Sequence, residues 1–143
     1  ELLVHMPFTA RLLHYQTSLH GTLDGNELIE YYKKKLLNSK IKLLEIPKNI
    51  NSSHHLLPAL YEFKNLRHKA NFFNFMKKNK ILLQVLYIPI YKHPYYQNRK
   101  INYSEFYNSE FFYKNVFSLP LHLKLTKKNI DYICSKLMEW LNS

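Results

Sequence analysis

Residues 115–141 of the 143-residue chain read NVFSLPLHLKLTKKNIDYICSKLMEWL, an extended stretch followed by a periodic one. After Thr126, apolar side chains recur at the spacing of one helix face: Ile130, Ile133, Cys134, Leu137, Trp140 and Leu141. Thr126 is a residue type favoured at helix N-caps. The pattern predicts an extended crossing over 116–125, then a C-terminal helix that packs on a sheet.

Two further helices are predicted upstream of this stretch. Residues 66–80, LRHKANFFNFMKKNK, have lysines in the last turn, which favours a helix. Its apolar face would consist of Leu66, Ala70, Phe73 and Met76 or Lys77. Residues 104–115, SEFYNSEFFYKN, would form a helix capped by Ser104. Its buried side would consist of Phe106, Tyr107 and Phe111.

Three segments are predicted as strands. KLLEI at 42–46 would end at Pro47, and HHLLPALYEF at 54–63 would follow a polar loop. His54 and His55 would then point to opposite faces. Pro58 inside this run favours an edge position or a bulge. ILLQVLYI at 81–88, ended by Pro89 and Pro94, is too continuously apolar to be half exposed.

The first 40 residues are predicted to form a helical arm, and residues 41–143 a small α/β domain. One arm helix begins near Thr9, and Gly21 and Gly25 separate it from a second helix capped by Asn26. The first has Leu12, Tyr15, Gln16 and Leu19 on one face, and the second Leu28, Ile29, Tyr32, Leu36 and Leu37. The predicted fold class is α+β, a small sheet covered by helices on one face.

The composition excludes several function classes. Two glycines in the whole chain leave no glycine-rich loop, so a P-loop and a dinucleotide fingerprint are excluded. The longest apolar stretch, residues 81–91, is too short for a membrane helix. A single cysteine permits no intrachain disulfide and fits a reducing, cytoplasmic location.

The formal net charge of +11 has two interpretations. Only Arg11, Arg67 and Arg99 are arginines, whereas Lys, Asn, Ile, Tyr and Phe, which have A/T-rich codons, are abundant. A low-G+C genome would produce this basicity without a selected partner, and we favour that interpretation. A selected anion-binding surface is the alternative.

Few residues have the pattern of a catalytic or metal site. Eight histidines show neither an HExxH arrangement nor carboxylates at ligand spacing, so no metal site is predicted. A Ser/His/Asp triad is limited by two aspartates, Asp24 and Asp131, of which Asp131 is explained by the dipole of the last helix. Cys134 lies on an apolar helix face and is predicted to be an inert, buried thiol.

Three segments together resemble a known family. They are NSSHHLLPALYEF (51–63), KNKILLQVLYIPIYKHPYYQN (78–98) and EFFYKNVFSLPLHLKLTKKNIDYICSKLMEWL (110–141). Their order, spacing and motif residues are similar to those in the C-terminal part of the DegT/DnrJ/StrS pyridoxal-phosphate sugar aminotransferases, above all the transaminases of the pseudaminic acid pathway. The most specific motif is the SLPL ending at 118–121 with the Leu-Thr at 125–126. The match covers residues 46–141.

The resemblance implies the small C-terminal domain of a fold-type I pyridoxal-phosphate transferase. Such an enzyme moves an amino group from glutamate to a nucleotide-linked 4-keto sugar for surface or flagellar glycans. RLLHYQTSL at 11–19 resembles a family segment that places Arg11 on the family arginine. Thr9 stands where the family asparagine reaches the cofactor phosphate of the neighbouring subunit. Tyr87, His93 and Tyr95 would lie on the substrate side, although Leu86 replaces a family histidine.

The family's aldimine lysine is not found in this sequence. None of the 18 lysines lies in the family's K....GEGG setting, so no catalytic residue and no cofactor are expected for this chain alone. The chain does not begin with Met, and we expect a piece or degenerate remnant of a longer enzyme, acting as a homodimer or with a large catalytic domain. Two alternatives remain: a stand-alone domain that pairs with a separately encoded catalytic half, and, less favoured, an RNA-binding module.

Overall fold

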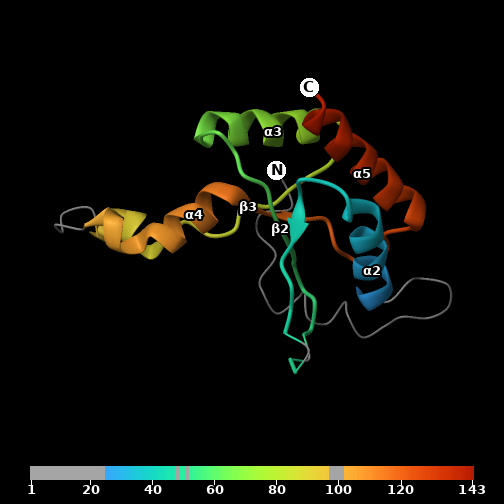
Figure 1. Ribbon diagram of the computed structural model, residues 1–143, viewed down its shortest axis with the longest axis horizontal. Helices are drawn as coiled ribbons and strands as arrows, with labels where there is room; N and C mark the ends of the chain where they lie inside the picture. The colour runs from blue at the N-terminus through green and yellow to red at the C-terminus, as the bar shows by residue number, and fades with distance from the viewer. Residues whose placement is uncertain (1–24, 48, 51, 97–101) are drawn as a thin grey trace.

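The computed structural model describes residues 25–47, 49–50, 52–96 and 102–143, apart from the side chain of Tyr103. Its helices are α2 (Gly25–Leu36), α3 (Leu66–Lys78), α4 (Tyr107–Asn115) and α5 (Lys127–Leu141), and its strands are β1 (Lys42–Leu43), β2 (Leu57–Leu60) and β3 (Val116–Leu119). Figure 1 shows α2, α3 and α5 gathered beside the sheet, whereas α4 extends away from them. The arm helix predicted near Thr9, with its face Leu12–Leu19, lies outside the described residues.

The sheet has the order β1-β2-β3, and both pairs of neighbours are antiparallel. Leu57 pairs with Leu119 and Ala59 with Phe117, and all four side chains are buried in the main core. The helices α2, α3 and α5 contribute most of the other core residues, and the connecting segments add Ile41, Phe63, Ile81 and Leu125. This arrangement confirms the predicted α+β fold with a small sheet covered by helices.

Pro58 lies in the central strand, so the predicted edge position is wrong, as is the bulge. The register from Leu57 to Leu60 is continuous with β3. On the other side, the Leu44 amide donates to the Pro58 carbonyl over 3.1 Å. A complete ladder pair would also need an N–H from Pro58, which proline lacks. The proline therefore ends β1 at Leu43, which makes β1 shorter than the predicted strand over 42–46.

The C-terminal helix forms as predicted. Thr126 is its N-cap, and its hydroxyl accepts from the Asn129 amide over 3.2 Å while the Asn129 side chain accepts from the Thr126 amide over 2.9 Å. This reciprocal pair satisfies donors that would otherwise lack partners at the helix start. The residues buried from this helix are Ile130, Ile133, Cys134 and Leu137, and Trp140 and Leu141 are partly buried against the same core.

Helix α2 packs against α5 and belongs to the same core. Leu28, Ile29, Tyr32 and Leu36 are buried as predicted, and the Tyr32 hydroxyl donates to the Pro120 carbonyl over 3.0 Å. Two details are wrong: Asn26 lies inside α2 because the helix already includes Gly25, and Leu37 is exposed because it follows the last helical residue. The division between residues 1–40 and 41–143 stays a prediction.

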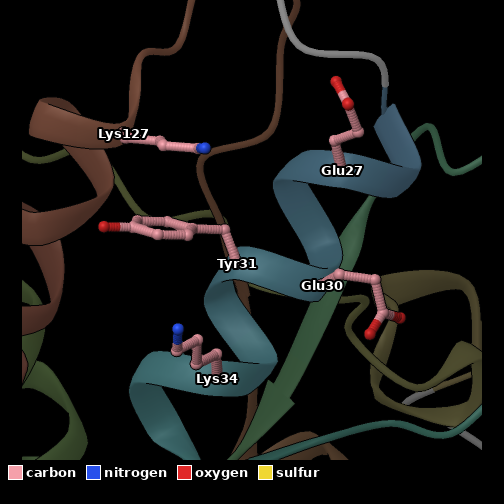
Figure 2. Close-up of a pocket in the computed structure, with 5 residues that line it drawn as sticks. All are labelled: Glu27, Glu30, Tyr31, Lys34 and Lys127. Atoms are coloured by element: carbon pink, nitrogen blue, oxygen red, sulfur yellow. The ribbon is translucent and has the colours of Figure 1, made fainter.

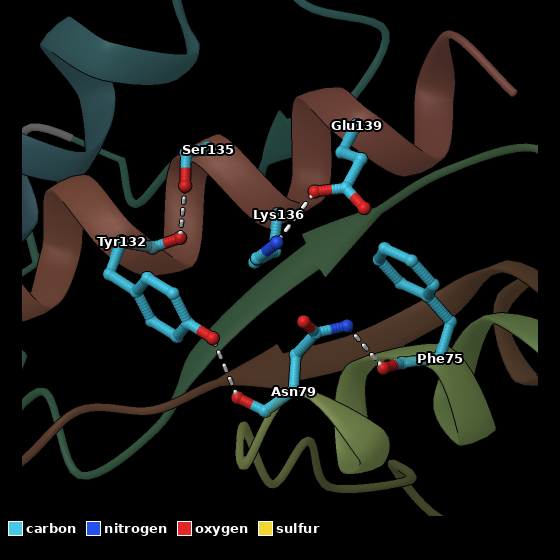
Figure 3. Close-up of polar contacts among 6 residues, drawn as sticks. All are labelled: Phe75, Asn79, Tyr132, Ser135, Lys136 and Glu139. Carbon is cyan, nitrogen blue, oxygen red and sulfur yellow. Dashed lines mark hydrogen bonds and ion pairs between the residues drawn. The ribbon is translucent and has the colours of Figure 1, made fainter.

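Helix α3 begins at Leu66 as predicted but ends at Lys78, two residues before the predicted end, and of its predicted apolar face only Met76 is fully buried. Lys69, Phe72 and Met76 are buried, whereas Leu66 and Ala70 are exposed. The helix is rotated toward its aromatic side because Trp140 of α5 packs there, against Phe72, Phe75 and His68 with ring centroids 5.4–5.6 Å apart. Figure 3 shows the adjoining polar contact, in which the Tyr132 hydroxyl donates to the carbonyl of Asn79 after α3, over 3.2 Å.

Residues 81–88 do not form the fully buried strand predicted from their apolar run. They pair with β3 through one bridge, in which Gln84 and Ser118 exchange backbone hydrogen bonds of 3.2 and 2.9 Å. Ile81 and Leu86 are buried, but Leu82, Val85, Tyr87 and Ile88 are exposed. The segment lies beside β3 at the sheet edge, where a continuous apolar run does not require burial on both sides.

Two other local predictions are corrected. Helix α4 begins at Tyr107 after a 3₁₀ turn, η3 (Tyr103–Phe106), and Asn102 rather than Ser104 caps that turn. Phe106 and Tyr107 are exposed and Phe111 is only partly buried, because α4 projects from the core (Figure 1). His54 and His55 precede β2 instead of lying in it, and His54 has a positive φ of 47°.

Candidate substrate-side surface

The three predicted substrate-side residues lie on one exposed segment between the sheet edge and α4. Tyr87 is 71% exposed and Tyr95 77% exposed, and His93 is also exposed. Tyr87 therefore lies at the surface and does not fill the sheet. The predicted cofactor-side residues Thr9 and Arg11 lie outside the described residues, so their placement relative to this segment stays a prediction.

Two consecutive 3₁₀ turns shape this segment, η1 (Ile90–Lys92) and η2 (Pro94–Tyr96). Pro89 directly precedes η1, and Pro94 is the first residue of η2. The restricted φ of proline favours a turn at both positions. The backbone closes through three hydrogen bonds: Lys92 to Pro89 at 2.9 Å, His93 to Ile90 at 3.1 Å and Tyr96 to His93 at 2.9 Å. We refer to residues 90–96 as the tyrosine turn.

Glu110 of α4 contacts the tyrosine turn with both carboxylate oxygens. Oε1 accepts from the Tyr91 hydroxyl over 2.8 Å, and Oε2 accepts from the Lys92 ammonium over 2.6 Å. The Tyr91 ring packs on Phe106 with centroids 4.4 Å apart, and Tyr91 is only 8% exposed. Partial burial acts to raise the pKa of Glu110, but the hydrogen bonds from Lys92 and Tyr91 hold it below its ordinary value.

A buried lysine fixes the other end of α4. The Lys69 ammonium, on α3, donates to the carbonyls of Tyr113 and Val116 over 2.6 and 2.8 Å. These carbonyls lie at the C-terminal end of α4, where the helix dipole favours a cation. Burial lowers the pKa of Lys69 to about 8. The Tyr113 ring has the Lys69 ammonium 5.4 Å and the Lys92 ammonium 5.1 Å from its centroid, so it contacts both α3 and the tyrosine turn.

Sequence reasoning missed both Glu110 and Lys69. The partners of Glu110 are 18 and 19 residues away, and those of Lys69 are 44 and 47 residues away. No local periodicity marks such contacts. The one available signal was the position of Lys69 between the apolar residues of α3, at helical spacing from Phe72, Phe73 and Met76.

The described residues do not fit pyridoxal phosphate. The cofactor needs a lysine amine free to form a Schiff base, an acid for the pyridinium nitrogen and donors around the phosphate. Lys69 is the one lysine buried among the described residues, and two backbone carbonyls occupy its ammonium. No carboxylate is hydrogen-bonded to it there. We derive no chemical step through the cofactor from these residues, and the expectation that this chain alone holds none stays a prediction.

Metal and thiol chemistry receive no support from the described part of the chain. No three side chains of His, Cys, Asp or Glu lie there in an arrangement that could hold a metal ion. Cys134 is buried as predicted, and burial raises the pKa of its thiol to about 11. A thiol with that pKa is a poor nucleophile at neutral pH.

An open hollow of about 310 Å³ lies between α2 and the start of α5 (Figure 2). It is lined by Glu27, Glu30, Tyr31, Lys34 and Lys127. Close by, Asp131 accepts from Tyr31 over 3.0 Å and pairs with Lys35 over 2.6 Å. Asp131 lies beyond the first turn of α5, so its ion pair with α2 explains it better than the predicted dipole contact. The mixed charges suit a helix–helix contact at the surface.

The comparisons with known proteins agree on one family. The family model for DegT/DnrJ/EryC1/StrS aminotransferases matches residues 22–138. An uncharacterized protein of Methanocaldococcus jannaschii is 30% identical over 105 residues, 67% of this chain and 27% of its own length. The Helicobacter pylori UDP-4-amino-4,6-dideoxy-N-acetyl-beta-L-altrosamine transaminase is 33% identical over 92 residues, 64% of this chain and 24% of its own. The chain thus spans about a quarter of these curated relatives.

Solved structures of aminotransferases have a similar fold over most of this chain. A Streptococcus pneumoniae protein described as a sugar aminotransferase, in its PMP-form, superposes with a TM-score of 0.75 at 24% identity, over 82% of this chain and 30% of its own. Helicobacter pylori PseC, described as an aminotransferase in pseudaminic acid biosynthesis, gives a TM-score of 0.70 at 27% identity, over 82% and 32%. Within the described residues, no helix has the length and apolar character needed to cross a membrane.

Proposed function

Because the chain belongs to the DegT/DnrJ/EryC1/StrS aminotransferase family, we propose that it forms the small C-terminal domain of a pyridoxal-phosphate-dependent sugar aminotransferase. In this proposal, a large catalytic domain supplies the aldimine lysine, the acid and the phosphate site. The reaction transfers an amino group from glutamate to a nucleotide-linked 4-keto sugar for a surface or flagellar glycan. The proposed location is the cytoplasm.

The observation that carries the proposal is the family match over residues 22–138, which includes the whole described core and the tyrosine turn. The sugar substrate is supported by the Helicobacter pylori transaminase, whose name specifies a UDP-linked amino sugar. The PLP-form and PMP-form structures of the Streptococcus pneumoniae protein support the cofactor for longer relatives.

The tyrosine turn and Tyr87 would face the sugar nucleotide. Tyr87 and Tyr95 each offer an exposed ring that can pack on a sugar or base and a hydroxyl that can hydrogen-bond to it. His93 offers an imidazole between them in sequence. Thr9 and Arg11 would act from the neighbouring subunit of a dimer, on the cofactor side. Arg11 stands at the position of the family arginine, and Thr9 stands in place of the family asparagine.

A chimeric enzyme tests this function. The part of the Helicobacter pylori transaminase that matches this chain is replaced by the corresponding residues of this chain. We expect the chimera to bind pyridoxal phosphate and to aminate its UDP-linked 4-keto sugar with glutamate, whereas the 143-residue chain alone does neither. A chimera that folds and binds the cofactor but aminates no nucleotide sugar would contradict the proposal.

A matched pair of variants assigns the role of Tyr87 in that chimera. Tyr87→Ala removes an exposed ring on the proposed substrate side, and Leu82→Ala removes an exposed apolar side chain of the same segment. We expect Tyr87→Ala to lower kcat/KM for the sugar nucleotide, while Leu82→Ala leaves it close to that of the parent chimera.

A further inference from the structure

Alongside the Phe106 and Tyr113 rings, Glu110 contacts the tyrosine turn from outside its own sequence. The Glu110 carboxylate accepts from the Tyr91 hydroxyl at 2.8 Å and from the Lys92 ammonium at 2.6 Å. Because each oxygen has a different donor, the two hydrogen bonds fix the orientation of the turn relative to α4. Tyr91 and Lys92 immediately precede His93 and Tyr95, and the backbone hydrogen bond from His93 to Ile90 couples them. A displacement of Glu110 would therefore move the exposed residues of the turn.

Glu110 can serve as a fixed reference because α4 is anchored to the core at its C-terminal end. Lys69 binds the Tyr113 and Val116 carbonyls there. Asn115, the last residue of α4, is buried; its side chain accepts from the Phe63 amide at 3.0 Å and its carbonyl from the Tyr61 amide at 3.1 Å. The helix thus extends from the core as a support, and Glu110 stands on it beside the turn.

We propose that Glu110 is a positioning residue, which sets the orientation of the tyrosine turn and through it the placement of His93 and Tyr95 toward the substrate. The substrate part of this inference rests on the proposed function, whereas the contact between α4 and the turn does not. Glu110 touches no substrate in this proposal. It acts through Tyr91 and Lys92.

A purely stabilising role predicts a different outcome from a positioning role. Glu110 is partly exposed and belongs to α4, outside the core formed by α2, α3, α5, β2 and β3. Loss of its contacts should therefore release the turn and leave the core unchanged. If Glu110 only stabilised the domain, its loss would lower the protection of amides from hydrogen exchange in the core as well as in the turn.

The first experiment uses the full 143-residue chain and measures amide hydrogen exchange. We expect Glu110→Gln to speed exchange in residues 90–96 by about tenfold and to leave residues 130–137 of α5 unchanged. The control, Glu139→Gln, removes an ion pair within α5, between Glu139 and Lys136. It should leave the exchange rates of residues 90–96 unchanged. The charge exchange Lys92→Glu with Glu110→Lys should restore part of the protection, because it re-forms the ion pair but not the hydrogen bond from the Tyr91 hydroxyl. Unchanged exchange in 90–96, or an equal rise in α5, would overturn the proposal.

The second experiment places the same variants in the chimeric enzyme. We expect Glu110→Gln to lower kcat/KM for the sugar nucleotide about tenfold, with cofactor binding unchanged, and the charge exchange to recover part of the loss. If the turn loosens in the chain but kcat/KM in an active chimera stays the same, the positioning role is refuted. An inactive parent chimera would contradict the proposed function, and the exchange result would still decide whether Glu110 holds the turn.

Discussion

The core and the projecting part of this molecule are built by different forces. In the core, side chains of α2, α5 and the sheet such as Leu28, Phe117 and Leu137 are fully buried, and apolar burial stabilises the fold. In the projecting part, which consists of residues 82–96 and 102–115, most apolar side chains are exposed, and polar contacts of Glu110 and Lys69 determine the geometry. The comparison teaches that one set of residues stabilises the fold, and that a separate set determines the position of the candidate surface.

The strongest test of this comparison removes α5. Truncation after Lys124 deletes the buried side chains Ile130, Ile133 and Leu137, each worth about 1.5–3 kcal/mol when fully buried. Their sum is comparable to the whole stability of a small domain, so we expect the cooperative thermal transition to disappear in circular dichroism. Deletion of Ser143 alone should leave it in place, and a truncated chain that still melts cooperatively would show that the core does not need α5.

A matched pair of leucines compares the two regions directly. Leu137→Ala opens a cavity in the core and should reduce the free energy of unfolding by about 2–5 kcal/mol. Leu82→Ala, in the projecting part, removes a side chain that is already exposed and should change it by less than about 0.5 kcal/mol. Urea denaturation measures both, and equal effects would mean that the two regions share one core.

The pH dependence of the core can be followed through Cys134. Its thiol has a pKa of about 11 in the folded chain, raised from 9.0 by burial. The unfolded chain therefore loses this proton first as pH rises, so stability is expected to fall between about pH 9 and 11. At pH 8 a disulfide reagent should react with Cys134 only after unfolding, and Cys134→Ala should remove this part of the pH dependence. Fast reaction with the folded chain would contradict it.

The pH dependence of the projecting part should have the opposite direction. The pKa of Glu110 is lowered in the folded chain, so its contribution is present above the ordinary carboxyl pKa and is lost as pH falls through the lowered value. We expect hydrogen exchange in residues 90–96, corrected for its intrinsic rate, to rise at acidic pH before α5 opens. Glu110→Gln should abolish this early step.

The smallest expected effect concerns the turn that joins the two regions. After α3, Lys80 has a φ of 62°, its amide donates to the Lys77 carbonyl and the Ile81 amide donates to the Met76 carbonyl. This is a Schellman ending, at which glycine is usual. Lys80→Gly should relieve the left-handed strain and stabilise the chain by up to about 1 kcal/mol. Lys78→Gly, inside α3, should destabilise it by a similar amount.

The sequence predicted the regions of this fold unequally. Helix α5 was predictable because its cap and its apolar period are both local. The segment 81–88 was not, because an apolar run is the same whether its strand is central or at an edge. Pro58 was misplaced because its missing N–H faces the short strand β1, which pairing geometry reveals and sequence does not.

The candidate surface was predictable only through family resemblance. Tyr87, His93 and Tyr95 were named from the motif and lie exposed on one segment, and their substrate-side role stays a prediction. Their supports were not found, because Lys69 and Glu110 act on residues far away in sequence. A single lysine or glutamate in a helical pattern is ordinarily solvated.

The cap that Lys69 provides makes the end of α4 dependent on a distant helix. Helix α4 has nine residues, too few to be stable alone in water. Its terminal carbonyls find their cation on α3, 44 and 47 residues away in sequence. We therefore expect α3, β2 and β3 to associate before α4 becomes rigid. In refolding kinetics, residues 107–115 should gain protection in a late phase, with φ-values near zero, while α5 and β3 are already formed in the transition state.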